Sequence, residues 1–458
     1  MRPQSFLLSF SLAALIALPA QAFATTRHDL NTPGVTAVIN GEALPDKVVD
    51  IMQTLAQHSD SKASRADVVQ AMIDDRLLAA VARQQYSVAQ LLEDNKVGFK
   101  PEIQLEQSLA SDLLAAFGLR LDAAVKAEKG GKLDGVIVLR REPAKADWNA
   151  VLGAKQKMLL EYALDEKGRK AAAGVMLLTY RLDKKTPGQI SLLDVYDAQN
   201  VQGRNQLHAR DAGFALAQAQ MLLERRYVIH WAKTRSGLGS EGYAVFRRAV
   251  EDRLLRNGWM ALIGVSSDIH DDNENLKKLA AEATPAEVKA YYEQHRDEFR
   301  RIEKVRARHI HVRDEKAAAA AYSRLQKGEN FAAVAAAVSQ APDAAQGGDL
   351  GWILHGEKPP TWLESLTFVQ PTGVPSRPFR SPAAAGEKPF WEILLVEEKV
   401  QGYQPEDSPE VRYVAAQDIA RKKALQNYRA TLERERAAAD IHLRPELAPL
   451  SRQNGSSS

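Results

Sequence analysis

Two histidines in the segment VRARHIHV are the residues of this chain best suited to polar chemistry. Apolar and polar residues alternate across residues 305–312, which predicts a β-strand. Side chains two positions apart in a strand point to the same face, so His309 and His311 should lie side by side. Such a pair can line a polar site, bind a carboxylate or, together with His355, hold a metal ion. We expect no metal, because no ligand motif supports the last alternative.

These histidines begin a segment in which strands and helices alternate. Asp314 and Gly328 are the residue types that begin and end a helix. GGDLGW follows the second predicted helix, and its glycines permit a tight turn and a close approach of the backbone. The predicted elements, in order, are a strand over 305–312, helices over 314–328, 331–340 and 359–368, and an apolar strand over 390–398.

In this order, residues 302–400 resemble the parvulin family of peptidyl-prolyl cis-trans isomerases. The resemblance rests on ARHIHV, RLQKGENFAAVAAAVSQ, GGDLGW, LESLTF before TGVPSRPF, and WEILLVEE. It implies an FKBP-like α+β domain, isomerase activity on X-Pro peptide bonds and no cofactor. VINGEALP near the start and TPAEVKAYYEQHRDEF before the domain are similar to the SurA and PrsA type of extracytoplasmic folding factor.

Isomerisation of an X-Pro bond needs neither a strong nucleophile nor a metal, because no covalent bond is made or cut. The barrier of roughly 18–20 kcal/mol arises from twisting a conjugated amide. A catalyst must hold the prolyl ring in an apolar slot and favour the twisted amide over the planar one. Small, positioned polar groups beside an apolar floor suit that task.

The resemblance assigns the apolar part of such a site to a few side chains. Leu350 lines the proline slot, and Trp352 from the same segment is expected to contact substrate. Leu363, or Trp362 if the register shifts by one, takes the position of the family's aromatic floor residue. Phe368 supports the helix behind it. Leu350, Leu363 and Phe368 could equally be plain core residues.

The polar part departs from the family pattern. His309 matches the first-strand histidine, but Glu392 replaces the histidine of the last strand. The family's Cys or Asp falls on Ala341 by strict spacing, and on Asp343 if the gap shifts. His311 stands where an aliphatic residue is usual, so His309, His311 and Glu392 could rebuild a polar site; Glu392 could equally pair with a protonated histidine. Retained isomerase activity and a domain that only binds chains therefore both stay open.

The N-terminal segment has the features of a secretory signal. Arg2 precedes an apolar run from Phe6 to about Pro19, and Ala20-Gln21-Ala22 is a small-x-small cleavage site. The run is shorter than the roughly 20 residues that span a bilayer. We therefore predict a signal peptide over residues 1–22, with cleavage after Ala24 as the alternative, and a periplasmic protein that does not span the membrane.

Composition bounds the remaining function classes. A chain of 458 residues is too long for one ordinary domain. It has 61 basic and 58 acidic residues, a net charge of +3, which gives no sign of nucleic-acid binding. It has no cysteine, which excludes disulfides, thiolate metal sites and a cysteine nucleophile.

The rest of the chain is predicted to be mainly helical. Ser64 and Asp67 form a capping box before a helix, and Thr284, Pro285 and Glu287 mark the start of another. A short strand and turn at VINGEALP come before the first helix. Helices are expected over 46–57, 65–86, 102–129, 147–180, 214–233, 243–263, 285–299 and 405–438. The predicted domains are 33–185 (helical, SurA-like), 186–300 (second helical region), 302–400 (parvulin-type), 401–450 (C-terminal helix) and 451–458 (disordered tail).

An internal repeat is an open question. MIDDRLLAAVA at 72–82 and LLERRYVIHWA at 222–232 share an acid, arginine and bulky apolar pattern. The stretch EDRLL at 251–255 fits equally well. A duplicated helical module and a general likeness among amphipathic helices are both compatible with these matches.

We expect an α+β multidomain protein that acts as an extracytoplasmic isomerase and folding chaperone. Its partners would be unfolded or exported polypeptides with X-Pro bonds, neither nucleic acid nor a membrane, and a homodimer stays open. The alternative is a chaperone or assembly scaffold without catalysis, including one dedicated to a single export pathway.

Overall fold

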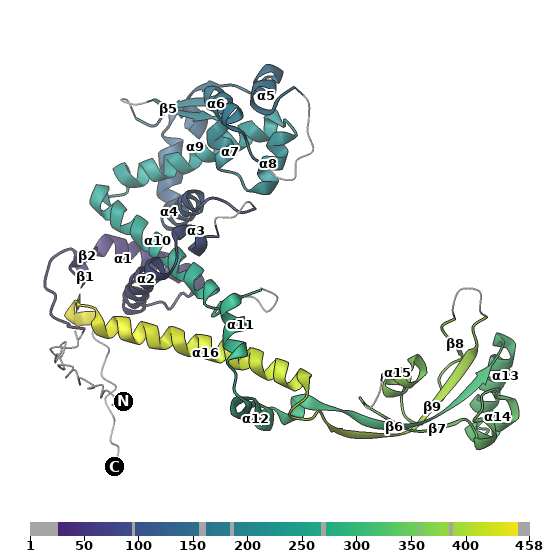
Figure 1. The fold of residues 1–458 in the computed structure, drawn as a ribbon. Helices are drawn as coiled ribbons and strands as arrows, with labels where there is room; N and C mark the ends of the chain where they lie inside the picture. The colour runs from purple at the N-terminus through teal and green to yellow at the C-terminus, as the bar shows by residue number, and fades with distance from the viewer. Residues whose placement is uncertain are drawn as a thin grey trace, which may run out of the picture. The chain divides into compact units, whose positions relative to one another are not determined.

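The computed structural model describes residues 26–93, 97–154, 162–183, 187–266, 272–356, 359–383 and 388–447 (Figure 1). The predicted signal peptide and C-terminal tail lie outside these residues. Contacts divide the chain into a helical unit, Met1–Asn275 with Ala424–Ser458, and a sheet unit, Leu276–Lys423. The boundaries predicted at residues 185 and 400 do not coincide with this division.

The helical unit begins with the predicted short strand and turn. Strands β1 (Val35–Ile39) and β2 (Glu42–Pro45) form a hairpin, and its turn residues Asn40 and Gly41 have φ angles of 50° and 81°. Both positive angles belong to the turn type that suits a two-residue hairpin. Strand β10 (Ile441–Leu443) pairs antiparallel with β1, so the C-terminal segment completes a sheet that the N-terminal segment begins.

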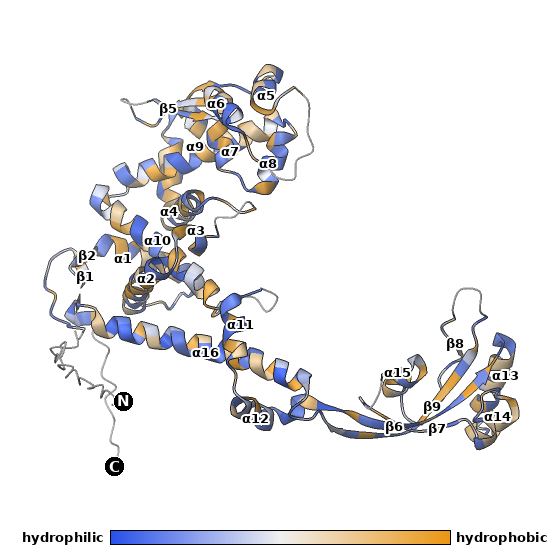
Figure 2. Ribbon diagram, viewed as in Figure 1, coloured by the Kyte–Doolittle hydropathy of each residue, from blue (hydrophilic) through white to orange (hydrophobic). Residues whose placement is uncertain are grey.

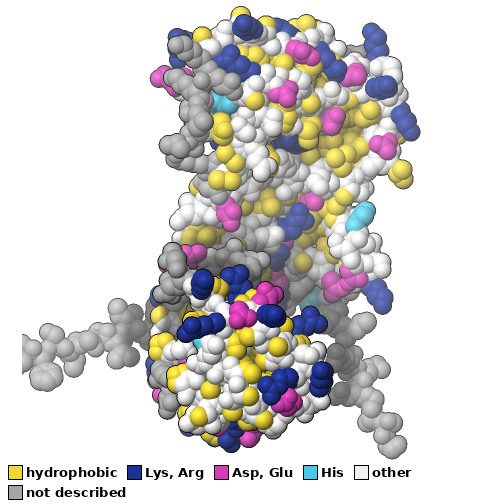
Figure 3. All heavy atoms as spheres, turned by 90° about the vertical axis from the view of Figure 1, so that its right-hand side faces the viewer, with side chains coloured by type: hydrophobic (Ala, Val, Ile, Leu, Met, Phe, Trp, Pro, Cys, Tyr) yellow, Lys and Arg dark blue, Asp and Glu magenta, His cyan; other side chains and the backbone are white. Residues whose placement is uncertain are grey.

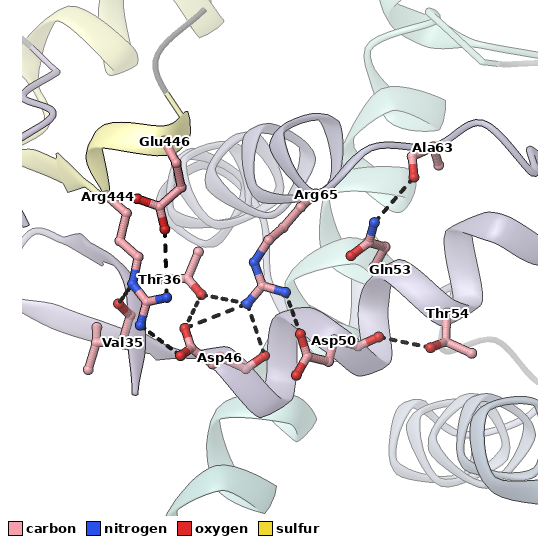
Figure 4. Close-up of polar contacts among 10 residues, drawn as sticks. All are labelled: Val35, Thr36, Asp46, Asp50, Gln53, Thr54, Ala63, Arg65, Arg444 and Glu446. Atoms are coloured by element: carbon pink, nitrogen blue, oxygen red, sulfur yellow. Dashed lines mark hydrogen bonds and ion pairs between the residues drawn. The ribbon is translucent and has the colours of Figure 1, made fainter. Parts of the chain in front are cut away.

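A polar network joins this C-terminal segment to the N-terminal sheet (Figure 4). Arg444 Nη2 lies 2.7 Å from Asp46 Oδ2, and Arg444 Nε donates to the Val35 carbonyl at 2.7 Å. The fully buried Thr36 donates to Asp46 at 2.6 Å, and Arg65 Nη2 donates to the Thr36 hydroxyl at 2.9 Å. Burial raises the pKa of Asp46, but hydrogen bonds from Thr36 and Arg444 outweigh it and lower the pKa overall.

Long helices surround the main core of this unit. The side chains of Leu113 and Phe246 are fully buried there. The predicted capping box is confirmed, since Asp67 N–H donates to Ser64 Oγ and Ser64 N–H donates to the Asp67 carboxylate. The helices are α1 (Asp46–Ser59), α2 (Arg65–Gln85), α3 (Val88–Leu91), α4 (Pro101–Lys126), α9 (Ala212–Arg235) and α10 (Gly239–Leu262).

The helix predicted over 147–180 is wrong in its last part. Residues Met176–Arg181 form strand β4, which lies between β3 (Ile137–Arg140) and β5 (Pro187–Ser191) in an antiparallel sheet. Leu177 and Leu178 are both buried, so the apolar run shows no two-residue alternation, and periodicity alone cannot separate such a strand from a helix. Short helices lie around this sheet: α5 (Lys145–Leu152), α6 (Glu166–Gly174), α7 (Leu192–Asp197) and α8 (Val201–His208).

Of the stretches that share the charge pattern, residues 72–82 in α2 and 251–255 in α10 lie on helices that contact each other, whereas residues 222–232 lie in α9. Helix α2 packs on α10, and Asp75 Oδ1 accepts from Arg256 Nη2 at 2.9 Å. Asp252 Oδ1 in turn accepts from Arg83 Nη1 at 2.9 Å. Mutual ion pairing therefore gives a physical reason for the acid and arginine pattern in both helices.

The sheet unit holds a four-stranded antiparallel sheet with the order β7-β6-β9-β8. Thr284 and Glu287 form the predicted capping box of α12, and Asp314 caps α13 as expected. GGDLGW supplies a turn and then strand β7. The elements are α11 (Glu274–Ala281), α12 (Pro285–Gln294), β6 (Arg300–Val312), α13 (Glu315–Gln326), α14 (Phe331–Val338), β7 (Asp349–Leu354), α15 (Trp362–Val369), β8 (Phe379–Arg380), β9 (Trp391–Tyr403) and α16 (Pro409–Ala438), which continues into the helical unit.

The two faces of this sheet bury different clusters. On one face Ile310 and Ile393 pack with residues of α13 and α14. On the other face Ala307 and Leu394 pack with residues of α15. Because side chains alternate along a strand, His309 and His311 belong to the second face, which α15 covers in part.

The described helices contain no segment long and apolar enough to cross a membrane. Figure 2 shows hydrophilic residues along α9, α10 and α16. On the face drawn in Figure 3, basic and acidic side chains are interspersed, as the nearly balanced composition predicts.

Candidate functional site

A buried carboxylate joins the two strand histidines. Glu392 lies opposite His311 in the pairing of β6 with β9 and is 2% exposed. Its Oε2 lies 2.9 Å from His309 Nδ1, and its Oε1 contacts His311 Nδ1. The structure therefore brings together the three residues predicted to form a polar cluster.

Asp343 completes this cluster from the loop before GGDLGW. Its Oδ2 lies 3.1 Å from His309 Nε2, at the start of a short 3-10 helix, Ala344–Gln346. Of the two alternatives for the family's Cys or Asp, Asp343 and not Ala341 contacts His309. Asp343 Oδ1 is buried and has no hydrogen-bond partner among the described residues.

The charge of His309 follows from its neighbours. Burial lowers the pKa of this imidazole, but the hydrogen bonds and charges of Glu392 and Asp343 outweigh burial and raise the pKa overall. Each ring nitrogen faces a carboxylate oxygen, and only the imidazolium form can donate from both nitrogens. This arrangement favours the imidazolium form of His309, which can donate to both carboxylates.

Apolar residues predicted for the proline slot lie on the same face of the sheet. Leu350, Leu363 and Phe368 are partly buried and pack on the cluster that contains Ile353 and Leu394. Leu363, rather than its neighbour, takes the position predicted for the floor. Trp362 is 36% exposed, and its ring contacts Phe379 edge-on with centroids 5.9 Å apart.

Trp352 is the predicted site residue that the structure does not bring to this cluster. The pairing of β6 with β7 shifts register between Gly351 and Asp349, so Leu350 lies at a β-bulge. Trp352 alternates with the buried Ile353 beyond this bulge, and its side chain points to the face opposite that of Ile353 and Leu350. There it is 39% exposed, with Lys304 Nζ 4.5 Å from the ring centroid. Trp352 therefore does not lie beside Leu350 in this cluster, and its contact with substrate stays a prediction.

The glycines of GGDLGW set the backbone beside His309. The amide of His309 donates to the Gly348 carbonyl at 2.9 Å, and the amide of Gly348 donates to the Asp343 carbonyl at 2.9 Å. Gly348 has a φ of 69°, and a Cβ there would lie 2.0 Å from the His309 carbonyl oxygen. Only glycine fits where this turn holds the strand and the Asp343 loop together.

Two contacts of His311 were not foreseen. The ring of Phe390 lies against its imidazole, with centroids 4.1 Å apart, and Ser339 Oγ accepts from its amide at 3.1 Å. The apolar pair Phe390-Trp391 at the start of the last strand was the available signal for the first contact. His355, the third histidine of the metal alternative, instead packs edge-on against Phe368. Among the described residues there is no group of three or more ligating side chains placed to hold a metal ion.

The comparisons with known proteins agree with this geometry. Residues 283–411 match the family model described as the PPIC-type PPIase domain. This segment is a parvulin-type PPIase domain. The match includes every residue of the polar cluster and the apolar residues beside it.

Similar proteins of known name carry foldase and chaperone descriptions. The Foldase protein PrsA of Caldanaerobacter subterraneus is 41% identical over 113 residues, which are 23% of this chain and 36% of that protein. The Chaperone SurA of Alkalilimnicola ehrlichii is 32% identical over 158 residues, 32% of this chain and 34% of that protein. The chain thus matches about a third of the length of each of these two relatives, and its PPIase domain is of the PrsA and SurA kind.

The comparison with solved structures gives matches of low identity and low TM-score. The crystal structure of the peptidylprolyl isomerase PrsA from Bacillus anthracis is 21% identical, with a TM-score of 0.20, covering 45% of this chain and 83% of that one.

Proposed function

We propose that the PPIase domain catalyses cis–trans isomerisation of X-Pro bonds in exported polypeptides, and that the helical unit holds such chains while they are unfolded. The observation that carries this proposal is the placement of a polar cluster and an apolar cluster on one sheet face. His309, Asp343 and Glu392 form the first, and Leu350 and Leu363 contribute to the second.

The proposed chemistry depends on holding a twisted amide. Leu350, Leu363 and the residues behind them receive the prolyl ring, which leaves the amide facing the polar cluster. Rotation removes the amide resonance, so groups that bind the twisted form more tightly than the planar one lower the barrier. Asp343 faces His309 from the loop beside this face of the sheet, so its carboxylate contributes to the field in which the amide twists.

The polar residues position one another. His309 is a positioning residue, because both of its nitrogens are engaged by protein carboxylates. Glu392 takes the role of the family's second histidine, because its carboxylate contacts both His309 and His311 and fixes the orientation of their rings. Asp343 holds the other ring nitrogen of His309 and has one buried oxygen without a hydrogen-bond partner among the described residues.

An isomerase assay coupled to a conformation-specific protease tests the proposal. We expect the wild type to accelerate isomerisation of a short X-Pro peptide, and Leu350→Arg to lose that acceleration. Leu354→Arg is the matched control: Leu354 lies on the same strand, is 44% exposed and alternates with the buried Ile353, so it points to the face opposite that of Ile353 and Leu350. A wild-type rate at the uncatalysed level would leave the binding-only scaffold as the function.

The second part of the proposal concerns holding unfolded clients. The full chain should suppress aggregation of a chemically unfolded protein, and Leu350→Arg should retain that suppression. If suppression is lost together with isomerisation, the two activities share one site, and the helical unit is not the holding surface.

The third part of the proposal is export. It rests on the signal-like segment before Ala22 and on the PrsA and SurA relatives of the PPIase domain. N-terminal sequencing of the protein from an expressing Gram-negative cell should give a mature chain that begins after Ala22, recovered with the periplasmic fraction. A full-length chain in the cytoplasmic fraction would contradict this.

A further inference from the structure

An open apolar pocket lies in the helical unit, between α4 and α9, away from the PPIase domain in the sequence. Its volume is about 610 Å³. Leu114 and Met221 form opposite parts of its wall, and each is 49% exposed. Surface apolar residues scattered singly need no explanation, but several around one cavity mark an interaction site.

A second pocket of about 430 Å³ continues from the first, and its lining has a different character. Gln107, Met221 and Arg225 line both, so the two form one groove. The second pocket is lined by side-chain amides that can both donate and accept hydrogen bonds, as a peptide backbone requires. The exposed amides among them are Gln202 and Gln206, whereas Gln199 donates to Gln218 at 3.1 Å and Asn200 Oδ1 accepts from the Gly203 amide.

A polar group at the junction lacks a partner. Arg225 Nη1 is buried and has no hydrogen-bond partner among the described residues. Burial also lowers the pKa of this guanidinium, and the charge of Glu106 offsets only part of the effect. A buried donor without an acceptor is costly.

Charge selects among the apolar ligands that could fill the groove. Asp122 and Glu224 line the apolar pocket, and neither has an ion-pair partner among the described residues. Together with Glu106 they give the surroundings of Arg225 a net negative charge, which disfavours fatty acids and other anionic amphiphiles. Basic residues that flank an apolar stretch would instead pair with both carboxylates.

We propose that this groove binds a segment of unfolded polypeptide in which bulky apolar side chains are flanked by lysine or arginine. The apolar side chains fill the pocket between α4 and α9. The amides of the second pocket bind the backbone that continues beyond it. The inference deepens the proposed holding of clients and rests on that part of the proposed function.

Binding of one labelled peptide to the full chain tests the inference. The probe is a fluorescein-labelled, proline-free peptide with leucines flanked by lysines, followed by fluorescence anisotropy. Leu114→Arg and Met221→Arg should each weaken binding by about tenfold or more, since each fills the pocket with a charge. Leu119→Arg is the matched control, because Leu119 lies on the same helix, is 88% exposed and does not line the groove.

A second comparison tests the charge selection. Replacing the lysines of the peptide with glutamates should weaken its binding to the wild type. Glu224→Gln should weaken binding of the lysine peptide and leave that of an uncharged leucine–serine peptide unchanged. Circular dichroism checks that every variant is folded.

The outcomes separate this inference from the isomerase proposal. Equal affinities of the Leu114→Arg and Leu119→Arg variants, or tighter binding of the glutamate peptide, would overturn the groove assignment whatever the isomerase rate. A selective loss in Leu114→Arg and Met221→Arg, with no isomerase activity in the wild type, would retain the groove and reject the isomerase.

Discussion

His309 Nδ1 and Glu392 Oε2 lie 2.9 Å apart in the interior of the sheet unit, where Glu392 is almost inaccessible to solvent. A buried carboxylate is costly unless its charge is compensated and its oxygens accept hydrogen bonds. Here the second oxygen contacts His311, so both conditions are met. Glu392 and the two strand histidines therefore form one interacting unit.

The first prediction concerns the charge state of His309. Glu392→Gln removes the anion that most strongly favours the imidazolium, so the pKa of His309 should fall. Histidine-selective carbon labelling and an NMR titration measure this directly. Glu397→Gln is the control, because Glu397 lies on the same strand but pairs with Arg308. An unchanged His309 titration in Glu392→Gln would mean that the carboxylate does not set its charge.

The same substitution has a consequence for stability. Because the pKa of His309 is raised in the folded state, its contribution to stability is complete below the unfolded value near 6.5 and is lost as the pH rises through the folded value. The wild type should therefore lose part of its stability above about pH 6.5. Glu392→Gln should lose roughly 1–3 kcal/mol at low pH and show a flatter profile in thermal unfolding.

The second prediction concerns the turn that holds the site. Gly348→Ala must adopt a positive φ and also place a methyl group against the His309 carbonyl. Gly351→Ala has a φ of 67° but open space around its Cβ, so it should cost only the roughly 1–2 kcal/mol of the left-handed conformation. We expect the first variant to be the less stable and to accelerate hydrogen exchange at the His309 amide. Equal effects of the two variants would show that the close approach is relaxed without cost.

Helices and strands could be predicted from the sequence where a local signal agreed with the packing. The capping residues Ser64, Thr284 and Asp314 act as predicted, because a cap depends on residues within one turn. The strand at Met176–Arg181 was missed because both Leu177 and Leu178 are buried, which removes the alternation that identifies a strand. Pairing of β10 with β1 joins segments about 400 positions apart and had no local signal.

Part of the candidate site could also be predicted from the sequence, and part could not. The alternation of side chains in a strand predicted that His309 and His311 share a face. The pairing of β6 with β9 places Glu392 beside them. The choice between Ala341 and Asp343 could not be made from spacing, because the loop is one residue short and its path is decided by the turn at Gly348. Trp352 was misplaced because the parity of β7 depends on its register with β6, which the sequence did not determine.

The third prediction concerns a buried acid in the helical unit. Burial raises the pKa of Asp75 to about 6, and the nearby charges of Arg256 and Arg253 only partly oppose it. The folded state then binds this proton more tightly than the unfolded state does. Its contribution is therefore present at acid pH and is lost as the pH rises through about 6, which amounts to roughly 3 kcal/mol at the full shift.

Asp75→Asn should remove this dependence. The measurement is chemical unfolding between pH 4 and pH 7, followed by fluorescence of Trp259, which lies on the neighbouring helix α10. The free energy of unfolding of the wild type should be larger at the acid end of this range, and that of the variant should change less with pH. Substitution of the exposed Asp60 by asparagine should leave the profile as in the wild type. A profile in Asp75→Asn that matches the wild type would assign the titration to another group.

The fourth prediction concerns the attachment of the C-terminal segment. Arg444→Met removes the ion pair with Asp46 and the hydrogen bond to the Val35 carbonyl, so β10 should open more often from β1. A charge-assisted hydrogen bond of this kind contributes roughly 1–3 kcal/mol, and the lower part of that range applies because both side chains are about a quarter exposed. The Leu443 amide belongs to β10 and donates to the Arg27 carbonyl at 2.7 Å, so its hydrogen exchange reports the release of β10 from its N-terminal neighbours as a whole. Because the pKa of Asp46 is lowered, the same amide in the wild type should lose protection as acid protonates Asp46, whereas Arg444→Met should depend less on pH.

Arg434→Met is the control, since Arg434 is exposed and pairs with its neighbour Glu435. Unchanged exchange at Leu443 in Arg444→Met would show that the backbone pairing with β1 holds the C-terminal segment without this arginine.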